Sequence, residues 1–250
     1  MYDLPKLEAS LANTIFSGKL HFAAVTGSTN NDALTAARSG APHGSVWFAD
    51  EQSAGRGRGG NAWRSAAGEG LYVSVLLRLQ IPASRLLLLP LAAGLAASGA
   101  IRATLPGVSI DLRWPNDLLI GPSKTGGILV EANSEASSGS FAVAGIGINV
   151  HQRSFDPGLA TPATSLDLAA GRSISRQALL VALLQALERE TAALRDPAAA
   201  ATVPATVTVA AGASSATFTV TTTAVTSNTF LLISGVYGGH TENAGFEVTP

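Results

Sequence analysis

The sequence contains no cysteine, which excludes disulfides, thiolate metal ligands and a covalent thioester intermediate. It also lacks a long apolar run. Its most apolar stretch, residues 86–97, is interrupted by Pro90 and Gly94 and is shorter than the ~20 residues that span a bilayer. The first residues show no basic segment followed by an apolar one, so we expect no signal peptide. These absences predict a cytoplasmic protein that does not bind a membrane.

Charge is scarce as well. Charged residues make up 13% of the chain and the formal net charge is −1, which argues against a general nucleic-acid-binding or anionic-membrane-binding surface. The hydrophobic content of 46% instead predicts a compact globular protein. Lysine is especially rare, with only Lys6, Lys19 and Lys124 in the whole chain. Because lysine is so rare in this chain, a lysine in a loop or turn is a candidate functional residue.

Apolar periodicity and turn residues predict an α+β fold for residues 1–195, with a mixed, largely antiparallel sheet flanked by helices that we expect on one side. The segment from Gly121 to Gly126 contains the glycine, proline and serine residues typical of turns, which predicts a β-hairpin. Strands are expected at 44–51, 70–78, 109–114, 118–120, 127–132 and 141–150, and helices at 32–38, at 84–104 and from Ser173 or Ser175 to 194.

The composition changes abruptly after Arg195. No lysine or arginine follows it, and the remaining chain is rich in threonine, valine, alanine and serine. Residues 205–209 and 216–221 alternate with a period of two, which is typical of β-strands with one buried face. We therefore predict a linker at 196–202 and a small all-β segment at 203–250.

The most distinctive motif runs from Gln52 to Arg64, called here the glycine–arginine loop. It packs four glycines and two arginines into residues 55–60. Glycine allows close approach of backbone N–H groups to a ligand, and arginine offers a planar fork of donors for carboxylate or phosphate. One interpretation is a loop that folds around an anion, and the other is a surface turn with solvated arginines. Its position between two apolar strands favours the structured loop.

A second cluster, Arg113-Trp114-Pro115-Asn116-Asp117, is followed by Lys124 and the paired glycines 126 and 127. It can be interpreted as a tight turn and a hairpin with a solvated lysine. The alternative is that Lys124 approaches a phosphoryl or carboxylate oxygen, while Asp117 orients an amine or holds Mg²⁺.

Other candidate residues have plain structural interpretations. Gly145 and Gly147 interrupt a strand, and we expect them to permit packing against a neighbouring strand. Asn149 is a structural candidate, and Ser28-Thr29-Asn30 fits a helix N-cap. The four histidines are scattered without the spacing of metal ligands.

Taken together, these motifs resemble the biotin–protein ligase family in order and spacing over residues 20–195. The matching segments are Ser28-Thr-Asn30, Gln52-Ser-Ala-Gly-Arg-Gly-Arg58, Trp63, Gly70-Leu-Tyr-Val-Ser74, Arg113-Trp-Pro-Asn-Asp117, Lys124-Thr-Gly-Gly-Ile128 and Gly145-Ile-Gly-Ile-Asn149.

The resemblance implies the fold of class II aminoacyl-tRNA synthetases and biotin ligases, and a two-step ligation. Biotin and ATP form biotinyl-5′-AMP, and a lysine of the biotin carboxyl carrier protein of acetyl-CoA carboxylase then attacks it. Mg²⁺ would be bound mainly through the ATP phosphates, with Asp117 as a candidate protein ligand.

The resemblance also implies the site residues. The implied catalytic residues are Lys124, Arg58 and Asp117. The implied biotin-binding residues are Ser28, Thr29, Asn30, Gln52, Gly55, Arg56, Gly57, Arg58 and Lys124. The implied adenylate- and ATP-binding residues are Arg56, Arg58, Trp63, Asn116, Lys124 and Asn149.

The sequence departs from the family pattern at both ends. Only about 20 residues precede the matching segments, too few for the helix-turn-helix domain of many members, so we expect a monofunctional enzyme without DNA as a partner. A homodimer is compatible with the resemblance. Residues 203–250 resemble an immunoglobulin-like repeat of bacterial surface proteins and not the family's SH3-like domain.

Two other functions stay open. A lipoate–protein ligase or octanoyltransferase shares the fold class, although the glycine–arginine loop disfavours it. A non-catalytic chimera or binding module with a surface-type β tail is the second alternative.

Overall fold

The computed structural model describes residues 2–81, 83–113, 116–135, 139–194, 201–202, 221–222, 229–237 and 240–248. The chain forms two compact units, Met1–Arg195 and Asp196–Pro250.

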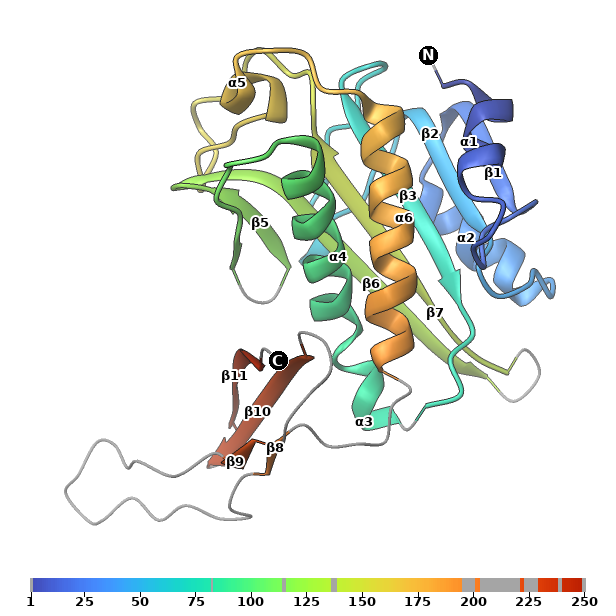
Figure 1. The fold of residues 1–250 in the computed structure, drawn as a ribbon, viewed down its shortest axis with the longest axis vertical. Helices are drawn as coiled ribbons and strands as arrows, with labels where there is room; N and C mark the ends of the chain where they lie inside the picture. The colour runs from blue at the N-terminus through green and yellow to red at the C-terminus, as the bar shows by residue number, and fades with distance from the viewer. Residues whose placement is uncertain are drawn as a thin grey trace. The chain divides into compact units, whose positions relative to one another are not determined.

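The first unit is built on a seven-stranded sheet with the order β1-β2-β3-β7-β6-β5-β4 (Figure 1). Strands β1 and β2 pair in parallel and all other neighbours pair antiparallel. The predicted α+β class with a mixed, largely antiparallel sheet is confirmed. The strands are β1 (Leu20–Thr26), β2 (Val46–Gln52), β3 (Gly70–Leu77), β4 (Asp111–Arg113), β5 (Asp117–Ile120), β6 (Ser123–Glu135) and β7 (Gly139–Asn149).

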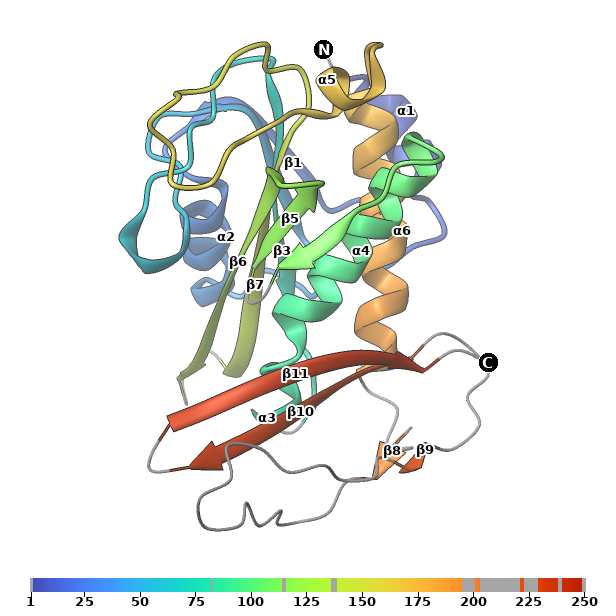
Figure 2. The ribbon, with the colours of Figure 1, turned by 90° about the vertical axis from the view of Figure 1, so that its left-hand side faces the viewer.

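Helices cover both faces of this sheet. The long helices α4 (Leu89–Thr104) and α6 (Arg176–Ala193) lie on one face, and α2 (Thr29–Arg38) lies on the other (Figure 2). The expectation of helices on one side was therefore wrong. The physical reason lies in β3, where all eight residues are buried and neither face can be left to water.

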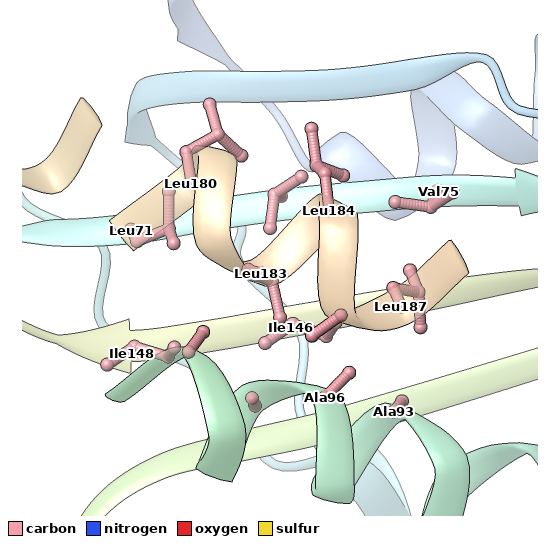
Figure 3. Packing of buried hydrophobic residues seen from close by; sticks show 14 of the residues in the cluster. Leu71, Val75, Ala93, Ala96, Ile146, Ile148, Leu180, Leu183, Leu184 and Leu187 are labelled. Carbon is pink, nitrogen blue, oxygen red and sulfur yellow. The ribbon is translucent and has the colours of Figure 1, made fainter. Parts of the chain in front are cut away.

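The main core lies between the sheet and the pair α4 and α6. Leucines of α6 pack onto β3 and β7, beside the small side chains Ala93 and Ala96 of α4 (Figure 3). Alanines let the two helices approach each other closely, while each buried leucine contributes roughly 1.5–3 kcal/mol. The α6 leucines in this core are Leu179, Leu180, Leu183, Leu184 and Leu187.

Local signals explain where the long helices begin. The side chain of Ser175 accepts a hydrogen bond from the backbone N–H of Ala178, so Ser175 and not Ser173 is the N-cap of α6. The helix expected at 84–104 is two helices, α3 (Ala83–Leu86) and α4. Pro90 lies in the first turn of α4, where a missing N–H costs no helical hydrogen bond.

The elements of the first unit that were not expected from the sequence are α1 (Leu4–Ser10), β1, the short 3-10 helix η1 (Arg58–Gly60) and α5 (Leu166–Ala170). Strand β6 also begins earlier than expected, at Ser123, so Lys124 lies in a strand. The turn of the β5–β6 hairpin is correspondingly short, with Gly121 at a φ of +55°. A register shift between Leu118 and Leu119 accompanies this shorter turn.

In the second unit, β8 (Ala201–Thr202) pairs antiparallel with β9 (Thr221–Thr222). Strands β10 (Thr229–Tyr237) and β11 (His240–Val248) form an antiparallel pair. Apart from Thr221, the alternating runs at 205–209 and 216–221 lie outside the described residues, as does most of the expected linker.

Candidate active site

A cavity of about 600 Å³ opens on the α2 side of the sheet, opposite α4 and α6. Its wall comes from the N-terminus of α2, the glycine–arginine loop and strands β3, β5, β6 and β7. Of the sequence-predicted residues, the structure brings together Ser28, Thr29, Asn30, Gln52, Arg56, Gly57, Arg58, Trp63, Asn116, Asp117 and Lys124.

The floor of the cavity is a buried polar network. The Ser74 hydroxyl donates to Asn30 Oδ1 over 2.5 Å and lies 2.8 Å from the Thr29 hydroxyl. The backbone N–H of Thr29 donates to Gln52 Oε1 over 2.9 Å, and Gln52 Nε2 donates to Ser65 Oγ over 2.8 Å. Buried polar groups satisfied in this way are fixed in orientation, so the floor is pre-organised.

Ser28 begins α2 but does not cap it in the expected way. It stands at the N-cap position without a side-chain cap hydrogen bond, and only 2% of its surface is exposed. Its hydroxyl is therefore available at the cavity wall and is not consumed by the helix terminus.

Gly145 and Gly147 make room for side chains of the site. A Cβ at Gly145 would lie 2.1 Å from Asn30 Oδ1, and one at Gly147 would lie 2.6 Å from Trp63 Nε1. The expectation that they permit strand packing was wrong. These positions must be glycine because Asn30 and the Trp63 indole lie directly on the sheet.

The glycine–arginine loop is folded back on itself. The N–H of Gly57 donates to the Asn61 carbonyl over 2.7 Å, and the N–H of Trp63 donates to the Gly55 carbonyl over 2.9 Å. Gly59 and Gly60 adopt φ values of +68° and +81°, which favour glycine. The structured-loop interpretation therefore agrees with the structure better than the solvated turn does.

The cations of the cavity differ in their partners. Lys124 Nζ lies 2.6 Å from Asp117 Oδ1 and 5.5 Å from the centre of the Trp63 ring, while Arg56 pairs with Glu131. Arg58 is exposed and has no ion-pair partner among the residues that the structure describes. Arg58 therefore lines the cavity without the ion pair that Lys124 and Arg56 each have.

Asp117 does not fit the role of a Mg²⁺ ligand. Its Oδ1 contacts Lys124 and its Oδ2 contacts Arg113, each over 2.6 Å. Within the described ranges, no group of three or more histidine, aspartate and glutamate side chains could hold a metal ion. Mg²⁺ carried by nucleotide phosphates remains chemically consistent with this donor set.

Burial alone would raise the pKa of Asp117, but hydrogen bonds and positive charge from Lys124 and Arg113 outweigh burial and hold the pKa below its ordinary value of 3.8. Because the folded-state pKa is lowered, the ionised carboxylate stabilises the fold above pH 3.8, and this contribution is lost as pH falls through the folded pKa. We expect Asp117→Asn to destabilise the protein at neutral pH and the difference from the wild type to shrink below about pH 4. Urea unfolding of both proteins across pH checks this, and a pH-independent difference would contradict it.

Two predicted residues lie elsewhere. Asn149 does not line the cavity; its Nδ2 donates to the Thr164 carbonyl over 3.1 Å. This placement supports the structural alternative and argues against a direct contact with nucleotide. Gly55 is buried at the base of the loop, where a Cβ would lie 2.4 Å from the Trp63 carbonyl oxygen. Trp114 and Pro115 lie outside the described residues.

Tyr72 and Ser74 also line the cavity and Glu131 joins its polar network, although none of the three was predicted as a site residue from the sequence. A polar serine within the otherwise apolar segment 71–77 was the signal for Ser74. Glu131, a charge ending the apolar run 128–130, could have been noticed in the same way.

Comparison with known proteins agrees with this geometry. A model of the biotin/lipoate A/B protein ligase family matches residues 22–149. A Bacillus spizizenii protein named "Bifunctional ligase/repressor BirA" is 37% identical over 186 residues, which cover 74% of this chain and 57% of the relative. A Mycobacterium tuberculosis protein named "Biotin--[acetyl-CoA-carboxylase] ligase" is 40% identical over 138 residues, covering 54% of this chain and 50% of the relative.

Among solved structures, the biotin protein ligase from Aquifex aeolicus in complex with biotin and ATP matches with a TM-score of 0.59 and 30% identity. The match covers 70% of this chain and 71% of that chain. The chain belongs to the biotin/lipoate A/B protein ligase family. It spans 50–57% of the length of the two curated relatives named above.

In the described part of the chain, we find no helix with the length and apolar character needed to cross a bilayer.

Proposed function

We propose that this protein ligates biotin to a lysine of a biotin carboxyl carrier protein, using ATP and passing through biotinyl-5′-AMP. One observation carries the proposal: a single cavity contains both the polar floor and the cationic side chains of Lys124 and Arg58. The polar floor can bind a small polar ring system, and the two cations can bind a carboxylate and a phosphate that lie next to each other.

The first step joins two anions. The biotin carboxylate attacks the α-phosphorus of ATP, the bond to the bridging oxygen breaks, and pyrophosphate leaves. Lys124, held by Asp117, stabilises negative charge between carboxylate and phosphate, and Arg58 binds the phosphate side. Mg²⁺ on the nucleotide would neutralise the triphosphate charge. Holding the two reactants aligned can supply up to roughly 7–11 kcal/mol of the barrier.

The second step transfers the biotinyl group. The uncharged acceptor amine attacks the carbonyl carbon of the mixed anhydride, the bond from that carbon to the phosphate oxygen breaks, AMP leaves, and the amine releases one proton to solvent. The earlier expectation gave Asp117 the task of orienting this amine. Its two ion pairs instead make it a holder of Lys124, and we assign it that role.

A lipoate or octanoate ligase is the alternative within this family. The cavity wall disfavours it, because a dithiolane ring or an alkyl chain would cover the Ser28 hydroxyl, which makes no cap hydrogen bond, without offering it a hydrogen-bond partner. Isothermal titration of the protein with biotin, lipoate and octanoate discriminates these ligands. Tight lipoate binding without biotin binding would reverse the assignment.

We further propose that the enzyme is monofunctional and cytoplasmic, with the carrier domain as its macromolecular partner. The formal net charge of −1 supports the absence of a DNA partner. Electrophoretic mobility shift with DNA tests this statement. Light scattering of the free protein tests the homodimer that is compatible with the resemblance. The β-rich tail from 203 onward is proposed to be immunoglobulin-like and not SH3-like.

The defining experiment mixes the full chain with labelled biotin, ATP and a carrier domain. The expected result is ATP-dependent labelling of one carrier lysine with release of AMP and pyrophosphate. Labelling that does not need ATP, or no labelling by a folded protein, would contradict the proposal.

Arg58→Gly should release biotinyl-adenylate about 10- to 100-fold faster, because a charge-assisted hydrogen bond to phosphate is lost. The free adenylate should then label bystander lysines. Mass spectrometry of labelled proteins measures this spread. The matched control is Arg64→Gly, since Arg64 belongs to the same loop but does not line the cavity. Equal selectivity of the two variants would refute the role of Arg58.

A further inference from the structure

The glycine–arginine loop is tied to the sheet through Glu131 of β6. Arg56 pairs with Glu131 Oε2, and the same oxygen accepts a hydrogen bond from Asn30 Nδ2 over 2.9 Å. Glu131 thereby joins the loop to a residue of the cavity floor. The residues in contact come from three separate elements, the loop, β6 and the N-terminus of α2.

The hydrogen bonds of Asn30 leave it one orientation. Its Oδ1 accepts from the Ser74 hydroxyl, so its Nδ2 faces Glu131 and the Leu129 carbonyl. Turning the amide over would place two acceptors together at Glu131. The hydrogen bond from Asn30 therefore positions the Glu131 carboxylate independently of Arg56.

The far side of the loop is tied to the same floor. Gln52 accepts from Thr29, Thr29 contacts Ser74, and Gln52 donates to Ser65 just beyond the loop's tryptophan. The loop thus has two attachments to the floor, Arg56 through Glu131 and its first residue Gln52 through Thr29. Beyond them, the tip carrying Arg58 has no ion pair with any described residue.

We propose that Glu131 is a positioning residue that holds Arg56 as an anchor of the loop, so that Arg56 acts through Glu131 and not as a phosphate ligand. The two arginines then have different tasks: Arg56 fixes the base of the loop and Arg58 meets the anion. The consequence for adenylate retention rests on the proposed ligase function, whereas the anchoring itself does not.

The ion pair is only partly buried, with 38% of the Arg56 side chain and 28% of the Glu131 side chain exposed. Such pairs add little to global stability. The loss of the pair should therefore appear in the local order of the loop and not in the unfolding midpoint.

The test is a double-mutant cycle with Arg56→Gln and Glu131→Gln. Glutamine at 131 keeps the shape and an acceptor for Asn30, so these variants should fold. The first measurement is hydrogen exchange of the Gly57 and Trp63 amides in the free protein. Each single variant should exchange about tenfold faster, and the double variant no faster than either single one, because both remove the same contact.

The second measurement is the release of biotinyl-adenylate. It should quicken about tenfold in each single variant, with less than a twofold further change when the second substitution is added. If Arg56 bound phosphate directly, Arg56→Gln would cost as much with glutamine at 131 as with glutamate. That additive outcome, or unchanged amide exchange in Glu131→Gln, would overturn the proposal.

Glu51→Gln and Arg102→Gln are the matched controls, because neither residue lines the cavity. Both should leave exchange and release unchanged, and equal effects in them would also overturn the proposal. A wild-type protein that forms no adenylate but shows the expected exchange pattern would refute the ligase function while leaving the anchor in place.

Discussion

Replacing Lys124 by alanine should slow biotinyl-adenylate formation by about 100- to 1,000-fold, the loss typical of a group that stabilises developing charge in a transition state. Lys124 lies on the cavity wall with its Nζ 2.6 Å from Asp117 and near the Trp63 ring. Among the described residues of the cavity, Arg56 is paired with Glu131 and Arg113 with Asp117, and Arg58 is assigned to the phosphate side, so no other cation is assigned to the position between carboxylate and phosphate. Pyrophosphate release under single-turnover conditions measures the step.

Lys6→Ala is the matched control, since Lys6 is one of the two other lysines and does not line this cavity. It should form adenylate at the wild-type rate. If Lys124→Ala did so too, the charge-stabilising role would be wrong. The folded state of Lys124→Ala should be verified by thermal unfolding, because Asp117 loses one of its two cationic partners.

Replacing Gly145 by alanine should weaken biotin binding by about 10- to 100-fold, because overpacking a tight site costs typically 1–3 kcal/mol. The added Cβ would lie 2.1 Å from Asn30 Oδ1 and 2.8 Å from Asn30 Cγ. Asn30 must then move, which breaks its contacts with Ser74 and Glu131 at once. Isothermal titration with biotin measures the change.

Gly99→Ala provides the control for this substitution. Gly99 lies within α4 and a Cβ there meets nothing within 4 Å. Alanine at this helical position should leave biotin binding unchanged and stabilise the protein by up to about 1 kcal/mol. Unaltered biotin affinity in a folded Gly145→Ala variant would show that biotin does not bind on this floor.

Local patterns predicted much of the fold. Apolar runs bounded by turn residues placed β2, β3 and β7, and the leucine spacing of 179, 183 and 187 placed α6. Strand β1 was missed because its burial is irregular, with neither clean alternation nor a continuous apolar run. The short helices α1 and α5 were missed because they span only seven and five residues.

The sequence predicted which residues line the site but not which of them form ion pairs and hydrogen bonds with one another. Eleven of the thirteen predicted site residues line one cavity, because their motifs lie at the ends of strands that become neighbours. Gly55 and Asn149 are the exceptions, because neither residue lines the cavity. Asp117 was only a candidate Mg²⁺ ligand, and the sequence did not show its ion pairs with Lys124 and Arg113, because a carboxylate in a turn carries no sign of which cations will face it.

By itself, the sequence determined the chemistry available to this protein: a glycine-rich loop with two arginines, a rare lysine beside paired glycines, and no cysteine nucleophile. Those follow from residue types and short spacings. Only the tertiary structure decided which cations are paired, since Arg56 meets Glu131 across 75 residues and Asn30 meets Glu131 across 101. Such contacts depend on strand order and register, which bring distant residues together and which no local pattern records. The division of tasks between Arg56 and Arg58 is therefore a property of the fold.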